Sequence, residues 1–460
     1  MVGHACDQLP IRASESNCYK STERTIPGHI KSDCIVLRFL RLMYNQMISK
    51  KESPFKKLAA LGRSTYQRKS SAVHRMLWPI RWTYGVLKRA LGKYSRDAWF
   101  LAAPDVQGDS ALKIVFSGKE KNMHFIADLA FGDTSNTVKI QRTRLWKRDL
   151  SKLIDRVQDG CLLIWETDGA PFQILNENKG FLIPCWVGGI VDISGDIATI
   201  LNQGKHGNRL NNIMRKIKDN NLSFDVTNDR SQIEDFYHHM YVPNVRRSHG
   251  ESTSPDMYAE VMERAEFCEL LQVKKDGENI AGALIDYLSV KDAPHIWETG
   301  IRDGNPAYLQ MRVIDVLYYF AISYLKSRKY EKTHFGGTRA FLNDGVTLYK
   351  RKWGFQVTNA KDKNFLLYPA ISNMAVREFL VRNPFICRDG EGLKAAVFVE
   401  GDRSLSSGDI ARLYREHSVR GLQGVIIYIL GDNLENIEVV VPPSLAGSVF
   451  IRSVHGSVSC

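Results

Sequence analysis

The sequence lacks the features that define several common classes of protein. Its eight cysteines lie far apart, with no C-x-x-C pair and no zinc-spaced Cys/His cluster, which argues against a disulfide framework and a structural zinc site. The most apolar run, residues 35–48, is interrupted by Arg38 and Arg41 and is shorter than a membrane-spanning helix. The first 30 residues also lack the charged and apolar regions of a signal peptide. We therefore expect a reduced, cytoplasmic protein without a structural metal.

The chain carries an excess of positive charge, and that excess is local. The formal net charge is +13 over 460 residues, yet residues 31–96 alone hold 16 lysines and arginines against two acidic residues. Apolar residues recur there at helical spacing, opposite the basic side chains, which predicts amphipathic helices. Trp78 and Trp82 add rings of the kind that favour a membrane interface.

Three interpretations of this basic segment stay open. Its helices can dock on the core of the protein and keep a solvated basic face. They can hold the protein at an anionic membrane surface, on the inner face of the membrane, because basic charge and tryptophans coincide. They can also contact nucleic acid, since basic and aromatic side chains together suit RNA.

The pattern of predicted elements divides the chain into five regions. We expect a disordered N-terminus (1–30), the basic helical segment (31–96), a strand-rich region (97–204), a mixed α/β domain (205–368) and a small accessory α/β region (369–460). In the fourth region the predicted order is β-α-α-β-β-β-α-β-α-β, with a hairpin turn at Asp276-Gly277. The fold class is therefore α/β (α+β), with a mixed sheet flanked by helices. The last region shows no catalytic motif.

The segment FLNDGVTLYKRKWGF, residues 341–355, poses a question about one lysine. Its apolar residues are spaced for one buried face of a helix: Val346, Tyr349 and Trp353. Asn343 or Asp344 can cap the start, and Gly354 can end the helix in a left-handed conformation. Basic residues near a helix C-terminus complement the helix dipole by roughly 0.3–1 kcal/mol each. That effect leaves the position of Lys350, beside the predicted buried face, unexplained.

The element order and the Asn343…Gly354-Phe355 spacing resemble the GNAT acyltransferase superfamily. Lys350 stands where many members carry a tyrosine, and the pattern DGv..yK..wG is similar to the FemABX-like branch. That branch includes peptidoglycan-bridge aminoacyltransferases and acetyltransferase-like proteins of polysaccharide clusters. HFGGTR, residues 334–339, also fits the branch. The resemblance covers residues 205–367, and it implies that region 97–204 is a first, degenerate GNAT-like half.

The resemblance implies catalytic roles for three residues. The Lys350 ammonium would stabilise the developing oxyanion or the donor phosphates, Glu298 would act as a base or contact the substrate, and His334 would shuttle protons. Gly300 would mark a bulge in the strand that donates a backbone N–H to the carbonyl. Plainer roles stay open: a helix-dipole partner, a solvated carboxylate and a structural histidine.

The resemblance also implies two binding sites. The loop that enters the predicted helix 307–328 would hold the donor phosphates through Arg302, Gly304 and Asn305. That loop departs from the Q/R-x-x-G-x-G/A motif of coenzyme A-binding members. Acceptor binding would fall to Arg246, Arg247 and Tyr349, for which exposed loop charges and a core tyrosine are the plainer alternatives.

Taken together, the resemblance implies an N-acyltransferase. It would move an acetyl or aminoacyl group from acetyl-coenzyme A (acetyl-CoA) or aminoacyl-tRNA to an amine of a cell-envelope glycan or its precursor. If aminoacyl-tRNA is the donor, the chain lacks the long coiled-coil insertion of some bridge-forming relatives, because no sustained heptad run is present. A non-catalytic scaffold that binds a membrane or a partner stays open as the alternative.

Overall fold

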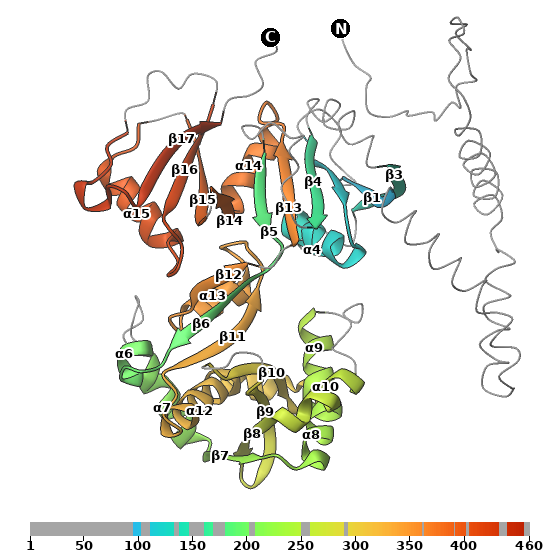
Figure 1. The fold of residues 1–460 in the computed structure, drawn as a ribbon, viewed down its shortest axis with the longest axis vertical. Coiled ribbons are helices and arrows are strands. Elements are labelled where there is room, and N and C mark those ends of the chain that lie inside the picture. Colours follow the sequence, from blue (N-terminus) through green and yellow to red (C-terminus); the bar gives the residue numbers. More distant parts are fainter. Residues whose placement is uncertain are drawn as a thin grey trace, which may run out of the picture. The chain divides into compact units, whose positions relative to one another are not determined.

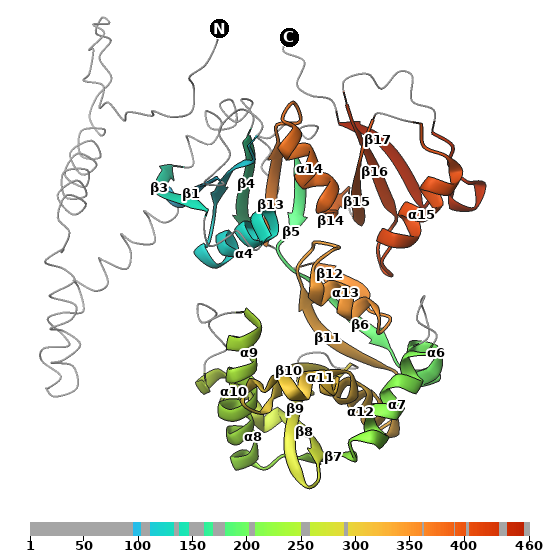
Figure 2. The same cartoon turned by 180° about the vertical axis from the view of Figure 1, so that it is seen from behind.

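Three β-sheets organise the part of the chain that the structure describes (Figure 1, Figure 2). The computed structural model describes residues 95–102, 111–132, 138–146, 161–168, 180–201, 208–249, 258–288, 293–360, 363–390, 392–401, 404–431 and 439–454. The chain divides into two units, Met1–Arg89 and Ala90–Cys460, and the described residues all belong to the second. The predicted N-terminus and the basic segment up to residue 94 lie outside the described residues.

The first sheet has six strands in the order β3-β1-β2-β4-β13-β5. They are β1 (Ser95–Ala102), β2 (Lys113–Ser117), β3 (Lys139–Trp146), β4 (Cys161–Asp168), β5 (Phe181–Pro184) and β13 (Lys363–Pro369). β2 and β4 run parallel and pair continuously, from Lys113↔Cys161 to Ser117↔Trp165. Helix α4 (Glu120–Phe131) follows β2.

The second sheet has seven strands in the order β12-β6-β11-β10-β9-β8-β7. They are β6 (Val187–Asp192), β7 (Leu222–Thr227), β8 (Cys268–Lys275), β9 (Glu278–Asp286), β10 (His295–Ile301), β11 (Lys332–Thr338) and β12 (Gln356–Ala360). Neighbouring strands are antiparallel except β10 and β11, which run parallel. Asp276 and Gly277 both have positive φ in the turn between β8 and β9, which confirms the predicted hairpin.

Helices accompany the second sheet in the predicted order. They are α6 (Ile197–Leu201), α7 (Arg209–Asp219), α8 (Arg230–Phe236), the π-helix η3 (Tyr237–Tyr241), α9 (Val242–His249), α10 (Tyr258–Arg264), α11 (Pro306–Gln310), α12 (Val313–Ser327) and α13 (Gly345–Arg351), with short 3₁₀ turns at η4 (Ala265–Phe267) and η5 (Arg302–Gly304). The order β-α-α-β-β-β-α-β-α-β is therefore confirmed, as is the α/β fold class.

Two helices differ from their predicted limits. The helix that follows β7 does not end at Pro243, where proline would favour an end, but continues to His249, because the π-helical turn before Pro243 shifts the hydrogen-bonding pattern where proline has no N–H to donate. The helix predicted as continuous over 307–328 breaks at Arg312, which adopts a left-handed conformation with a φ of 58°.

The two large sheets exchange strands across the predicted domain boundary. β6, which precedes residue 205, lies between β11 and β12 in the second sheet. β13, at the end of the 205–368 region, pairs with β4 and β5 in the first sheet. Local periodicity identifies a strand but not the sheet that it joins, so a boundary at 204/205 does not separate the two sheets.

The third sheet has the order β14-β15-β16-β17. Its elements are β14 (Phe385–Asp389), β15 (Gly392–Glu400), β16 (Val425–Leu430) and β17 (Val449–Val454), with α14 (Met374–Arg382), α15 (Ser407–His417) and η6 (Pro443–Leu445). Ser406 and Asp409 form a capping box at the start of α15. Arg351 of α13 donates to the carbonyls of Glu416 and Ser418, at the end of α15, over 2.9 and 3.1 Å.

No helix among the described residues is long and apolar enough to cross a bilayer.

Candidate active site

The parallel strands β10 and β11 separate almost as soon as they meet. They pair only at His295↔His334. Beyond this pair both strands are irregular: β10 shifts register against β9 between Ile296 and Thr299, and β11 shifts against β6 between His334 and Gly337. A bulge disrupts the ladder and redirects side chains. The two irregularities therefore open a gap between the strands in the middle of the sheet.

Gly300 does not mark the bulge, contrary to the prediction. It pairs regularly with Gly282, beyond the irregular part of β10. A Cβ at Gly300 would lie 2.4 Å from the carbonyl carbon of Met240. The glycine is therefore needed for close packing of β10 against η3.

Helix α13 carries Lys350 to this gap. Asp344 caps the helix by accepting from the Thr347 N–H over 3.0 Å, and Gly354 follows it with a φ of 77°, so both predicted ends are confirmed. The predicted buried face is partly wrong, because Val346 is 41% exposed while Thr347 and Lys350 are buried. These two polar side chains can face inward because each has a hydrogen-bond partner. The Thr347 hydroxyl lies 2.6 Å from that of Thr338.

The Lys350 ammonium is held inside the protein at the edge of the gap. Its side chain is 7% exposed, and Nζ donates to the Gly337 carbonyl over 2.7 Å. Burial lowers the pKa of Lys350 to about 8, and the carboxylates of Asp344 and Glu298 oppose that shift. Glu298 lies in the irregular part of β10. The structure therefore places the predicted pair Lys350 and Glu298 within electrostatic range of each other.

Two histidines lie at the closed end of the gap. The His334 and His295 rings have centroids 4.7 Å apart and planes at 83°. The Gly336 N–H donates to His334 Nδ1 over 2.9 Å, so the neutral His334 ring carries its proton on Nε2. His295 Nε2 is buried and has no hydrogen-bond partner among the described residues. Burial, followed by the charge of His334, lowers the pKa of His295 to about 3, which keeps this ring neutral.

Sequence reasoning missed His295. A single histidine at the start of a strand carries no local signal for a role. Only the pairing of β10 with β11 brings it beside His334. A Cβ added at Gly336 would lie 3.2 Å from His295 Nε2 and 3.7 Å from Lys350 Nζ, so His295, His334 and Lys350 surround one glycine of β11.

The predicted phosphate loop is occupied by contacts within the protein. Arg302 donates to both carboxylate oxygens of Asp235, at 3.3 and 2.8 Å, and to the Asn279 carbonyl at 3.0 Å. Asn305 caps α11 by accepting from the Ala307 N–H over 2.9 Å. Gly304 is buried, with a φ of 61°. Because the Arg302 charge is already paired, these residues do not fit a coenzyme A pyrophosphate without breaking that ion pair.

The predicted acceptor residues lie in two different places. Arg246 and Arg247 are exposed on α9, not in a loop, and Arg247 donates to Asn244 Oδ1 over 3.0 Å. Tyr349 precedes Lys350 on α13, and the Arg209 guanidinium stands 5.8 Å from the Tyr349 ring centroid. Arg209 in turn pairs with the buried Asp315 over 2.9 Å. The structure thus does not bring Tyr349 together with the two arginines.

Comparisons with known proteins give similarity of structure only. No protein-family description matches the chain, and no curated protein matches it in sequence. FemX matches with 13% identity and a TM-score of 0.33, over 60% of this chain and 89% of FemX. L-PGS from Bacillus licheniformis matches with 15% identity and a TM-score of 0.31, over 62% and 85%. A tandem GNAT protein from the clavulanic acid biosynthesis pathway matches with 11% identity and a TM-score of 0.22, over 56% and 78%.

Identities and TM-scores this low carry no argument about this chain. The predicted element order is present in the second sheet, and its parallel strands part after one pair. The second sheet therefore has the element order on which the sequence resemblance to the GNAT superfamily rests.

Proposed function

We propose that this protein is an N-acyltransferase whose reaction takes place in the gap between β10 and β11. The observation that carries the proposal is the Lys350 ammonium, 7% exposed and held at the gap by the Gly337 carbonyl. Burying a cation costs free energy unless hydrogen bonds or an opposite charge compensate it, and such groups are often found at functional sites. In acyl transfer the Lys350 ammonium would have a role, because negative charge develops on the carbonyl oxygen in the transition state.

In the proposed reaction the acceptor amine attacks the acyl carbonyl. The C–N bond forms, and the carbonyl electron pair becomes an oxyanion that the Lys350 ammonium stabilises. Glu298 takes the proton that the amine releases. The bond to the leaving group of the donor then breaks while the Nε2–H of His334 donates a hydrogen bond to that group. The proton that Glu298 took from the amine passes through solvent to the leaving group, which restores Glu298.

The identities of the donor and the acceptor are also part of this proposal. Acetyl-CoA and aminoacyl-tRNA are the two candidate donors, and an amine of a cell-envelope glycan or its precursor is the candidate acceptor. The test is transfer of labelled acetyl or aminoacyl groups to a panel of amines, glucosamine included. Transfer that Lys350→Met abolishes in a folded protein supports the proposal. A folded wild-type protein that transfers neither group to any amine contradicts it.

Calorimetric titration with acetyl-CoA, with coenzyme A as the control, separates the donors. Arg302→Ala is the matched variant, since the Arg302 side chain is the predicted phosphate partner and is paired with Asp235. Binding that Arg302→Ala weakens assigns the phosphates to this loop, whereas unchanged binding places them elsewhere. Absence of binding at millimolar ligand directs the next titration to charged tRNA.

We also propose that residues 31–96 hold the protein at an anionic membrane surface, because this segment carries 16 basic residues and two acidic ones. Removing the segment should abolish sedimentation with phosphatidylglycerol vesicles. Unchanged sedimentation contradicts this part of the proposal without affecting the active site.

A further inference from the structure

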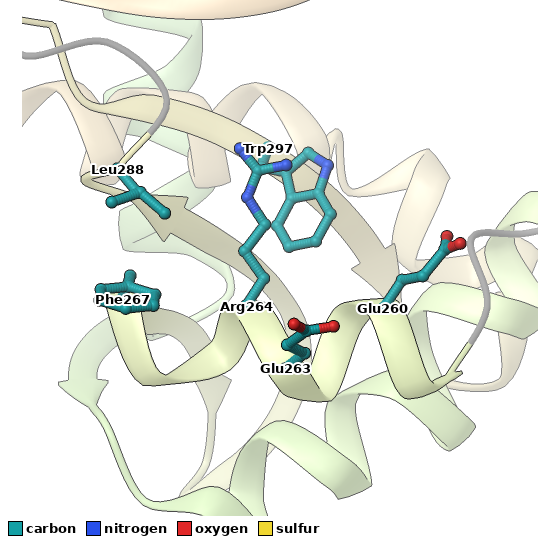
Figure 3. Close-up of a pocket in the computed structure, with 6 residues that line it drawn as sticks. All are labelled: Glu260, Glu263, Arg264, Phe267, Leu288 and Trp297. Atoms are coloured by element: carbon teal, nitrogen blue, oxygen red, sulfur yellow. The ribbon is translucent and has the colours of Figure 1, made fainter.

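A cavity of about 380 Å³ lies over helix α10 and the neighbouring strands β9 and β10 (Figure 3). Six residues line it: Glu260, Glu263, Arg264, Phe267, Leu288 and Trp297. None of them belongs to the predicted site. The cavity is nevertheless next to that site along the chain, because Trp297 directly precedes Glu298 in the irregular part of β10.

A second connection runs through Arg264. This arginine donates to Asp286 Oδ2, and Asp286 is fully buried. Asp286 is the cross-strand partner of His295, so the ion pair at the cavity wall stands beside the closed end of the gap. The cavity and the gap are therefore both next to β10. Trp297 lines the cavity, and Glu298 lies in the irregular part of the strand beside the gap.

The lining combines apolar surface with negative charge. Phe267 is 48% exposed and Leu288 is 60% exposed, although both are apolar. The Arg264 guanidinium lies 4.5 Å from the Trp297 ring centroid, and Asp286 compensates its charge. Neither Glu260 nor Glu263 has an ion-pair partner among the described residues. The two glutamates thus leave the cavity with a net negative charge beside an apolar wall.

From this combination we infer that the cavity is a binding site for an amphiphilic primary amine. The ammonium group pairs with Glu260 and Glu263, and an apolar or aromatic body covers Phe267 and Leu288. None of the lining residues is Lys350 or Glu298, so the inference goes beyond the proposed function and names a second site. It favours an amine with an apolar body over a bare amino sugar.

The test uses the full chain and three probes: 2-phenylethylamine, its neutral analogue 2-phenylethanol, and glucosamine. Calorimetry should show that 2-phenylethylamine binds more tightly than either of the others. Replacing both glutamates, Glu260→Gln with Glu263→Gln, should weaken it about threefold to tenfold, in line with exposed ion pairs. Glu266→Gln is the matched control, because Glu266 is exposed in the same segment and does not line the cavity. Equal binding of the neutral alcohol, or no effect of the double variant, overturns the inference.

Failure of this inference is distinguishable from failure of the proposed function. Weaker amine binding in the double variant, with acyl transfer unchanged, supports both the cavity and the function, whereas amine binding that the double variant leaves unchanged removes the cavity alone. Binding of the amine that depends on the glutamates, without transfer from any donor, keeps the cavity and removes the reaction. Lys350→Met should bind 2-phenylethylamine as the wild type does.

Discussion

The first and second sheets each contain a pair of parallel strands, and the two pairs differ in what lies between them. β2 and β4 pair continuously from Lys113↔Cys161 to Ser117↔Trp165, so no gap opens. At the end of this pair Glu166, 2% exposed, accepts from the Lys119 N–H at 2.8 Å and from Asn122 Nδ2 at 2.9 Å. A carboxylate of the protein itself therefore occupies the start of α4.

In the second sheet β10 and β11 pair once and then part. The opening holds a buried cation, Lys350, and a histidine nitrogen without a partner among the described residues, on His295. We expect this difference to correspond to a division of roles. The first pair is closed by a carboxylate of the protein and should contribute to stability, while the second carries the groups to which the proposed acyl transfer assigns roles.

The largest expected effect is on kcat, and it distinguishes the β10/β11 pair from the β2/β4 pair. Lys350→Met should lower kcat by about 10²- to 10³-fold, the usual effect of removing one group that stabilises an oxyanion. Glu166→Gln should leave kcat within about twofold. The measurement is the transfer rate at saturating donor, with circular dichroism to confirm that both variants fold. Comparable losses in the two variants contradict the division of roles.

A change at Glu166 should instead lower the stability of the fold. Glu166→Ala leaves the Lys119 N–H and the Asn122 amide without their carboxylate partner and should cost about 1–3 kcal/mol in the free energy of unfolding. Urea denaturation measures it. Glu120→Ala is the control, since this exposed acid in the first turn of α4 contributes only about 0.3–1 kcal/mol through the helix dipole. Equal costs in the two variants exclude a special role for Glu166.

The pH dependence of stability tests the burial of the Lys350 cation. Its pKa is lowered from 10.5 to about 8 on folding, so between these pH values the unfolded chain binds more protons than the folded one. The free energy of unfolding of the wild type should therefore rise with pH in this range relative to Lys350→Met, by about 1–3 kcal/mol. Urea denaturation at pH 7.5 and pH 10 measures the difference. Parallel behaviour of the two proteins means that the ammonium is not buried in solution.

The smallest effect concerns the glycine at the gap. Gly336 has a φ of 70°, and a Cβ there would lie 3.2 Å from His295 Nε2. Gly336→Ala should cost about 1 kcal/mol in thermal or urea unfolding. Gly345→Ala, at the start of α13 with open space around it, should be neutral or slightly stabilising. A neutral Gly336→Ala contradicts the described backbone at the gap.

Local chemistry determined much of this protein from the sequence alone. The element order of the second sheet follows from hydrophobic spacing, and the ends of α13 follow from Asp344 and Gly354. The hairpin follows from Asp276-Gly277, whose residues tolerate positive φ. Each of these features depends on a few neighbouring residues, and for this reason a short stretch of sequence predicts it.

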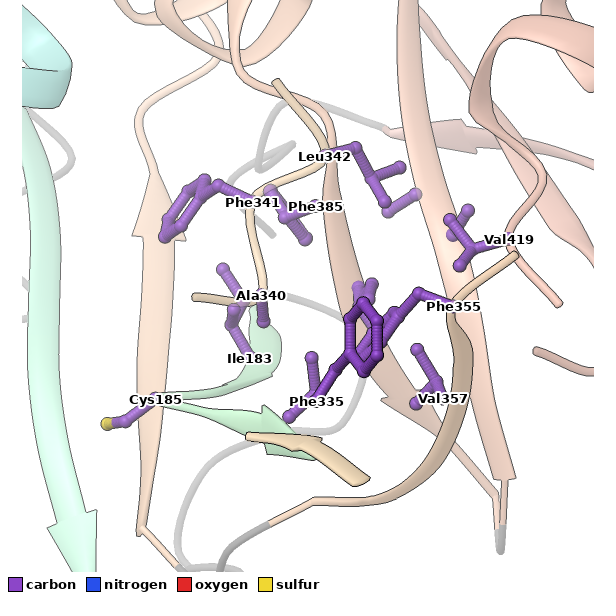
Figure 4. Close-up of a cluster of buried hydrophobic side chains, with 14 of the residues drawn as sticks. Ile183, Cys185, Phe335, Ala340, Phe341, Leu342, Phe355, Val357, Phe385 and Val419 are labelled. Atoms are coloured by element: carbon purple, nitrogen blue, oxygen red, sulfur yellow. The ribbon is translucent and has the colours of Figure 1, made fainter. Parts of the chain in front are cut away.

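Tertiary structure decided what distant segments do together. Local spacing predicted a buried Val346, but long-range partners turn Thr347 and Lys350 inward instead. Figure 4 shows the same principle in the core, where Phe335, Phe355 and Phe385 of one buried cluster come from separate strands or from the loop beside them. The exchange of β6 and β13, the pairing of Arg302 with Asp235 and the meeting of His295 with His334 join residues far apart in the chain. Hydrophobic periodicity is a local property, and it carries no information about which strand, charge or ring a residue will meet across the sheet.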